Sequence, residues 1–114
     1  VLDTGQVTMA GCDPVELTRT YLNRIIEFHL KDTRPEHRGG LEGPLPTPEQ
    51  ARQEPIFFEL GTGGVDFPAI LAILRKNAWQ GWLTVELDES RRGPHESARI
   101  SKQYIEKVLK LKIS

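Results

Sequence analysis

The sequence predicts an α/β fold in which short parallel strands form a sheet and helices cover its outer face. Two observations support this prediction. Apolar strand-type segments alternate with amphipathic helix-type segments four times along the chain, and capping or turn residues separate them. The 114 residues, with 38% hydrophobic and 27% charged residues, suit one globular domain with a modest core.

The first half of the chain predicts two strands and one helix. Residues 1–3 end a strand, and Thr4-Gly5 provides a turn signal. A helix begins after Asp13, because aspartate is a favoured N-cap and the following proline suits the first helical position. Residues 25–30 form the next strand, with Ile26, Phe28 and Leu30 toward the helices and Ile25, Glu27 and His29 on the other side.

The second half begins with a long loop. Residues from about 31 to 55 are rich in proline, glycine and charge, which is typical of a functional or mobile connection. A short strand at 56–60 precedes a helix capped by Asp66. Residues 81–87 form a strand, and apolar spacing over 98–109 indicates a closing helix.

Polar side chains occupy the carboxyl ends of three predicted strands. Asp3, His29 and Glu86 should converge, because parallel α/β folds form their active sites at this edge of the sheet. Two carboxylates and an imidazole suit Mn²⁺, Mg²⁺, Co²⁺ or Zn²⁺. A histidine at a strand end is more often a hydrogen-bonded structural residue, so the pattern alone leaves both interpretations open.

Four segments, in order, resemble the C-terminal half of the sugar phosphate isomerase/epimerase family: LDTGQVTMAGCDPVEL, RIIEFHLKD, GTGGVDFPAIL and GWLTVELD. That family has a xylose isomerase-like TIM barrel and includes inosose dehydratases, hydroxypyruvate isomerases and ketose 3-epimerases. The resemblance implies half of a (β/α)8 barrel, with about four parallel strands and outer helices. Residues 1–114 would then form a single partial domain.

The resemblance also implies roles for individual residues. The metal ligands fall on Asp3, His29 and Glu86, and Glu86 is also a catalytic acid/base. Substrate contacts fall on Gln6 and Arg34. Lys31 is added from its position directly after the strand, where it is placed to line the site. Gln6 stands where the family has a histidine, and glutamine forms hydrogen bonds but does not titrate near neutral pH. The family's fourth ligand is a glutamate from an earlier strand, and no strand precedes Asp3 in this sequence.

The implied function is divalent-metal-dependent isomerisation, epimerisation or inosose-type dehydration of a small sugar or polyol-derived substrate through an enediolate. One alternative is a non-catalytic half-barrel, inactive because the N-terminal glutamate is absent. Another is a zinc-dependent endonuclease for abasic DNA. The chain has only three histidines and a net charge of −1, and both facts argue against this alternative. The GTGG segment predicts either a strand-to-helix turn or a phosphate cradle, of which the turn is the commoner.

The net charge and the cysteine count restrict the expected binding partners and the expected cellular compartment. A net charge of −1 provides no electrostatic basis for binding nucleic acid or a membrane. The single cysteine, Cys12, cannot form an internal disulfide, so a cytoplasmic location is expected. Half a barrel has two sheet edges and an open inner face, where Val1, Ile25 and Trp82 would meet water. We therefore expect a homo-oligomer, or a partner that supplies the missing N-terminal half-barrel.

Overall fold

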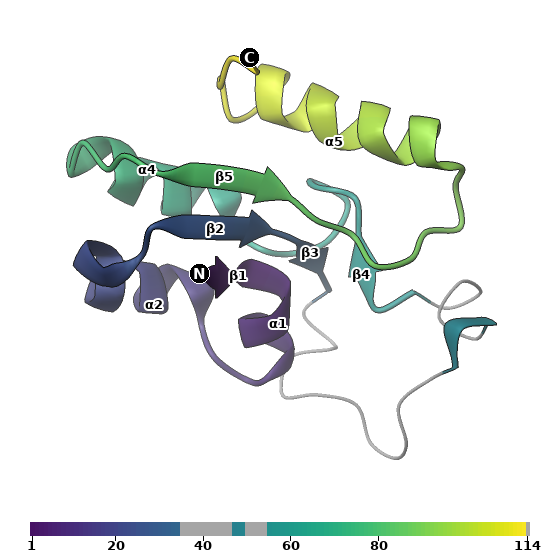
Figure 1. Ribbon diagram of the computed structural model, residues 1–114, viewed down its shortest axis with the longest axis horizontal. Coiled ribbons are helices and arrows are strands. Elements are labelled where there is room, and N and C mark those ends of the chain that lie inside the picture. Colours follow the sequence, from purple (N-terminus) through teal and green to yellow (C-terminus); the bar gives the residue numbers. More distant parts are fainter. Residues whose placement is uncertain (35–46, 50–54, 114) are drawn as a thin grey trace.

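The computed structural model describes residues 1–34, 47–49 and 55–113 (Figure 1). Most of the predicted long loop lies outside these residues. The elements in chain order are β1 (Leu2–Asp3), α1 (Thr4–Met9), α2 (Pro14–Tyr21), a 3₁₀ helix (Leu22–Arg24), β2 (Glu27–Leu30), β3 (Asp32–Thr33), β4 (Phe57–Phe58), α4 (Phe67–Lys76), β5 (Trp82–Val85) and α5 (Pro94–Lys107). The predicted α/β class, part of a barrel with parallel strands and outer helices, is confirmed.

The main sheet is parallel, with the strand order β1-β2-β5. The strand predicted at residues 56–60 does not join it. Only Phe57–Phe58 is extended there, and these residues pair antiparallel with β3. In the part of the chain that the structure describes there are thus three parallel strands instead of about four. A short apolar segment fits a parallel strand and a hairpin arm equally well, so its direction could not be predicted from the sequence.

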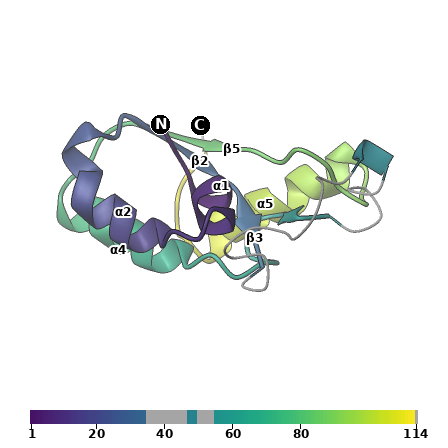
Figure 2. The same ribbon diagram turned by 90° about the horizontal axis from the view of Figure 1, so that it is seen from below.

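The helices α2 and α4 lie side by side on one face of the sheet (Figure 2). Both begin as the sequence predicts. Asp13 accepts a hydrogen bond from the backbone N–H of Val15 at 2.9 Å, and Asp66 accepts one from Ala69 at 3.0 Å. Each cap satisfies a backbone donor that the first helical turn leaves free. Among the described helices, none combines the length and the apolar character needed to cross a membrane.

The core lies between the sheet and the helices. Its buried members are Leu2, Ile25, Phe28, Leu30, Leu60, Phe67, Ile70, Leu71, Leu74, Ile105 and Leu109. Trp79 closes it at one end, because its ring packs edge-on against Phe28 with 5.2 Å between centroids. Its indole N–H donates to the carbonyl oxygen of Ile25 at 2.8 Å. Burial of large aromatic and aliphatic side chains on one face of β2 therefore anchors this strand.

The start of β2 differs from the prediction. The strand begins at Glu27, so the alternation of faces does not extend to the two preceding isoleucines. Ile25 is buried, with 8% of its surface exposed, whereas Ile26 is 73% exposed, which reverses the predicted orientation of both. Val1 and Trp82 are 69% and 75% exposed, as predicted for the open side of a partial barrel.

The carboxylate of Asp32 connects β3 to the glycine-rich segment 61–65. Oδ2 accepts hydrogen bonds from the backbone N–H of Gly61 (2.9 Å) and Gly63 (3.0 Å), and Oδ1 accepts from Val65 (3.0 Å) and Thr33 (2.9 Å). Burial raises the pKa of the Asp32 carboxyl, although these four donors act in the opposite direction. The backbone donors that a phosphate cradle would need thus already bind an internal carboxylate, which favours the turn interpretation of GTGG.

Replacing Asp32 by alanine should lower the free energy of unfolding by about 3–5 kcal/mol, because four backbone donors lose one charged acceptor. Asp32→Asn should fall between alanine and wild type, since an amide offers one acceptor oxygen. Asp13→Ala is the matched control, with an expected loss of about 1 kcal/mol for a helix cap. Urea unfolding followed by circular dichroism measures all three. A loss for Asp32→Ala no larger than that of Asp13→Ala would contradict this assignment.

Candidate metal centre

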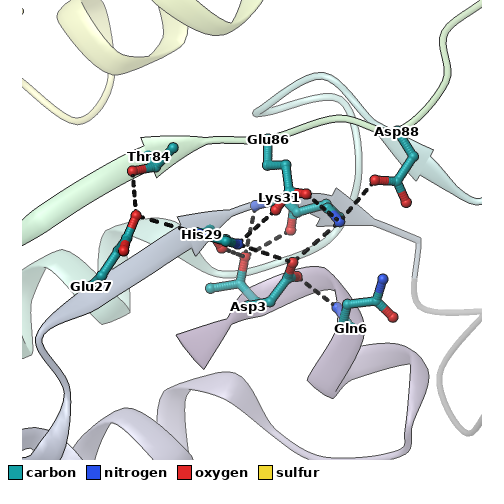
Figure 3. A network of polar contacts seen from close by, with 9 residues as sticks. Asp3, Gln6, Glu27, His29, Lys31, Thr84, Glu86 and Asp88 are labelled. Carbon is teal, nitrogen blue, oxygen red and sulfur yellow. Dashed lines mark hydrogen bonds and ion pairs between the residues drawn. The ribbon is translucent and has the colours of Figure 1, made fainter. Parts of the chain in front are cut away.

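The parallel register brings three strand-end side chains together: Asp3, His29 and Glu86, called here the strand-end cluster. Asp3 pairs with His29 across β1 and β2, and Glu86 directly follows β5. One ligand atom from each lies within 4.8 Å of the others. Nδ1 of His29 lies 2.7 Å from Glu86 Oε2 and 3.9 Å from Asp3 Oδ2 (Figure 3).

The donor set of this cluster fits a divalent cation. It offers carboxylate oxygens and an imidazole nitrogen, which suit Mn²⁺, Mg²⁺, Co²⁺ or Zn²⁺. Oε2 of Glu86 is buried, and its polar partner among the described residues is His29 Nδ1, 2.7 Å away in an ion-pair contact that lacks hydrogen-bond geometry. A divalent ion bound by both of these atoms would stabilise the buried oxygen. Metal binding by the cluster stays a prediction, for which this geometry provides a physical basis.

The ammonium group of Lys31 lies at the edge of the cluster. Its side chain is only 2% exposed, and Nζ lies 3.2 Å from Asp3 Oδ2, 3.7 Å from Glu86 Oε1 and 3.2 Å from Asp88 Oδ1. The ring of Phe57 lies below it, with the centroid 4.8 Å from Nζ. Burial alone would lower the pKa of Lys31, but hydrogen bonds and charges from Asp3 and Asp88 outweigh burial and raise it. Lys31 therefore stays a cation at neutral pH.

Helix α1 supports Lys31 from the side, and it begins at the residues predicted as a turn. The buried hydroxyl of Thr4 donates to the carbonyl oxygen of Lys31 at 2.8 Å and accepts from its N–H at 2.9 Å. A Cβ atom at Gly5 would come within 2.8 Å of Lys31 Cγ, so glycine leaves room for the lysine stem. The helix forms because Asp3 caps it by accepting from the N–H of Gln6 at 2.9 Å.

The other predicted substrate residues occupy two different places. Gln6 lies in α1 beside Asp3, which it contacts through its backbone (Figure 3). Arg34 follows β3, and its guanidinium lies over the ring of Phe58, 4.4 Å from the centroid. Their roles toward substrate stay predictions. Sequence reasoning missed Asp88 as a partner of Lys31, although its position two residues after Glu86 on the same side of the chain was the available signal.

The buried carboxylate of Glu59 holds the segment that follows Asp88 in place. Glu59 is 3% exposed and accepts hydrogen bonds from Ser90 Oγ at 2.5 Å and from Arg92 Nη1 at 3.1 Å. Burial alone would raise the pKa of Glu59, but hydrogen bonds from Ser90 and Ser97 and the charge of Arg92 outweigh burial and lower it. The chain after β5 is thereby held against β4, next to the strand-end cluster.

Together, the parallel sheet, the outer helices and the polar strand ends define an α/β-barrel type of protein with a site at the carboxyl edge of its strands. Residues 1–108 match the family described as xylose isomerase-like TIM barrel, and the chain belongs to this family. The resemblance recognised in the sequence is thus confirmed.

Curated relatives are similar to most of the chain. An inosose dehydratase of Clostridium botulinum is 36% identical over 107 residues, which cover 92% of the chain and 36% of that protein. The rhizopine catabolism protein MocC of Rhizobium meliloti is 40% identical over 96 residues, 83% of the chain and 29% of that protein. An inosose dehydratase of Clostridium tetani is 36% identical over 106 residues, with coverage of 91% and 36%. The chain thus spans about a third of the length of these relatives.

Replacing Lys31 by methionine should make the stability of the chain depend on divalent metal. Without metal, Asp3, Glu86 and Asp88 would repel one another, so the melting temperature should fall. With Co²⁺ present, affinity should rise by about tenfold or more, because a competing cation is gone. Calorimetric titration and thermal melts measure both effects, with the exposed Lys102→Met as control. Equal or weaker Co²⁺ binding by Lys31→Met would contradict this competition.

Proposed function

We propose that this chain forms the C-terminal part of a divalent-metal-dependent isomerase, epimerase or inosose-type dehydratase acting on a sugar- or polyol-derived substrate. The convergence of the strand-end cluster from three parallel strands is the observation on which the proposal rests. The inosose dehydratases among the relatives support the dehydratase branch and inosose as a first substrate to test. The activity is proposed for the whole protein, because the matched region is only 36% of the length of the inosose dehydratase relative.

The proposed ligands are Asp3, His29 and Glu86. A divalent ion bound there would polarise a substrate carbonyl group and stabilise negative charge on its oxygen. Glu86 has a second task, because its two oxygens differ. Oε2 faces His29, whereas Oε1 faces the ammonium of Lys31 at 3.7 Å. Oε1 is therefore the atom proposed to take up a proton from the substrate carbon next to the carbonyl group.

Lys31 is proposed to orient the substrate. Its ammonium has three donors, and Asp3, Asp88 and the ring of Phe57 fix its place. Because its pKa is raised, it acts as a hydrogen-bond donor to a substrate oxygen and not as a base. Delivery of the proton to the neighbouring carbon, with an O–H proton passing from one substrate oxygen to the other, gives isomerisation. Delivery of a proton to the same carbon from the opposite face gives epimerisation, and transfer of the proton to a departing hydroxyl group, which leaves as water, gives dehydration.

Metal titration of the purified chain tests the proposal. We expect Mn²⁺ or Co²⁺ to bind at one site, and Asp3→Asn, His29→Ala and Glu86→Gln each to weaken binding at least about a hundredfold, because each removes a ligand. Glu16→Gln on the exposed face of α2 is the matched control. In an inosose dehydration assay of the whole protein, Glu86→Gln should also lower kcat by about 10²–10⁴-fold. A wild-type chain that binds neither metal would refute the proposed function.

We further propose that the open edges and inner face associate with a second copy or with further barrel strands, in the cytoplasmic setting that the single cysteine suggests. β1 and β5 are the edge strands of the described parallel sheet. Trp82, the first residue of β5, and Ile26, whose carbonyl oxygen accepts from the N–H of Trp82, expose most of their surface. The chain alone should therefore elute as oligomers in light scattering, and Trp82→Thr should shift it toward monomer. A monodisperse wild-type monomer would contradict association.

A further inference from the structure

The two ring nitrogens of His29 face different carboxylates. Nδ1 points to Glu86 and Asp3, within the strand-end cluster. Nε2 points the other way, to Oε1 of Glu27 at 3.5 Å (Figure 3). Glu27 lies two residues before His29 on the same face of β2, so the strand geometry itself places it beneath the ring. The imidazole thus lies between the two carboxylates of the strand-end cluster, Asp3 and Glu86, and the carboxylate of Glu27.

Glu27 is itself fixed by the neighbouring strand. The hydroxyl of Thr84 donates to Glu27 Oε1 at 2.8 Å, which is the same oxygen that faces His29 Nε2. Thr84 lies directly opposite His29 in the parallel register of β2 and β5. The three side chains therefore form a row, Thr84–Glu27–His29, that leads from β5 back to the strand-end cluster.

This row determines which nitrogen of His29 is available. A carboxylate beside one imidazole nitrogen favours the tautomer with the proton on that nitrogen, which leaves the lone pair of the other nitrogen free. Without a cation, Glu86 Oε2, which lies 2.7 Å from Nδ1, competes for this proton with Glu27, which lies 3.5 Å from Nε2. A divalent ion bound between Asp3 and Glu86 would take the lone pair of Nδ1, and Glu27 would then hold the remaining proton on Nε2. Such outer carboxylates also fix the ring orientation and increase the basicity of the ligand nitrogen.

We propose that Glu27, held by Thr84, is a positioning residue that sets the tautomer and orientation of His29 for metal binding through Nδ1. The proposal rests on the proposed metal site and adds the two residues that direct it. It also gives Glu27, a half-buried acid on the inner side of the sheet, a partner that accounts for its position.

Co²⁺ titration of the full chain tests this role through affinity and through the visible absorption spectrum. Glu27→Gln should weaken Co²⁺ binding about 10–100-fold. Thr84→Val should weaken it less, because Thr84 acts through Glu27. The double variant should then resemble Glu27→Gln alone, since the two residues act in one row. Glu16→Gln, the same substitution on exposed α2, should match the wild type.

Nuclear magnetic resonance of the Zn²⁺-loaded chain tests the tautomer directly. In the wild type, a proton on Nε2 of His29 should give a downfield, slowly exchanging signal, and Glu27→Gln should shift that signal and speed its exchange. A proton on Nδ1, with zinc on Nε2, would overturn the proposal, as would wild-type Co²⁺ affinity in Glu27→Gln. These two outcomes concern a chain that binds metal, and they leave the proposed function intact. A wild-type chain that binds no metal would refute the proposed function itself, so the two failures are distinguishable.

Discussion

The parallel register of β1, β2 and β5 is the constraint on which the site depends. Asp3 lies opposite His29, and the N–H of Glu86 donates to the carbonyl oxygen of Leu30 at 3.1 Å. Because side chains alternate along a strand, a slip of one residue would turn His29 toward the helices and Phe28 toward the site. Phe28 and Leu30 are 0% and 1% exposed, and burying each contributes about 1.5–3 kcal/mol. The apolar face of β2 thus sets the position of the polar face.

The second constraint is charge balance among three neighbouring acids and a buried lysine. Asp3, Glu86 and Asp88 would repel one another at such close range, and a buried lysine without partners would be strongly destabilising. Lys31 lies within 3.7 Å of all three carboxylates, so the acids and the lysine make each other's placement possible. The arrangement is asymmetric, because Lys31 contacts all three acids, whereas His29 contacts only Asp3 and Glu86 among them (Figure 3). Asp3 and Glu86 also face His29, so their negative charge would attract a cation on that side, with Lys31 as its competitor.

The features that the sequence predicted are those governed by near neighbours or by the strand period. The caps Asp13 and Asp66 bond to N–H groups two or three residues away, and the strand-end cluster follows from where each strand stops. The features it did not predict depend on distant partners. Residues 56–60 have an apolar pattern suited to either strand direction, and their pairing with β3 decides between the two. Asp32 binds N–H groups 29 to 33 residues away, which no local pattern encodes.

The buried carboxylate oxygens of the described residues differ in their partners, and this difference separates structural carboxylates from the proposed functional one. Asp32 and Glu59 are almost fully buried, and every described contact of their oxygens is with a hydrogen-bond donor of the protein. Such groups hold segments in place and have little capacity left for a ligand. Glu86 is the contrasting case, because the partner of its buried oxygen Oε2 among the described residues is a ring nitrogen of His29, 2.7 Å away, and not a backbone N–H group. A cation could be bound by Glu86 and His29 together, whereas Asp32 and Glu59 would have to give up the hydrogen bonds that hold their segments. The proposed chemistry of the site therefore depends on the contact between Glu86 and His29 and not on the number of acidic residues nearby.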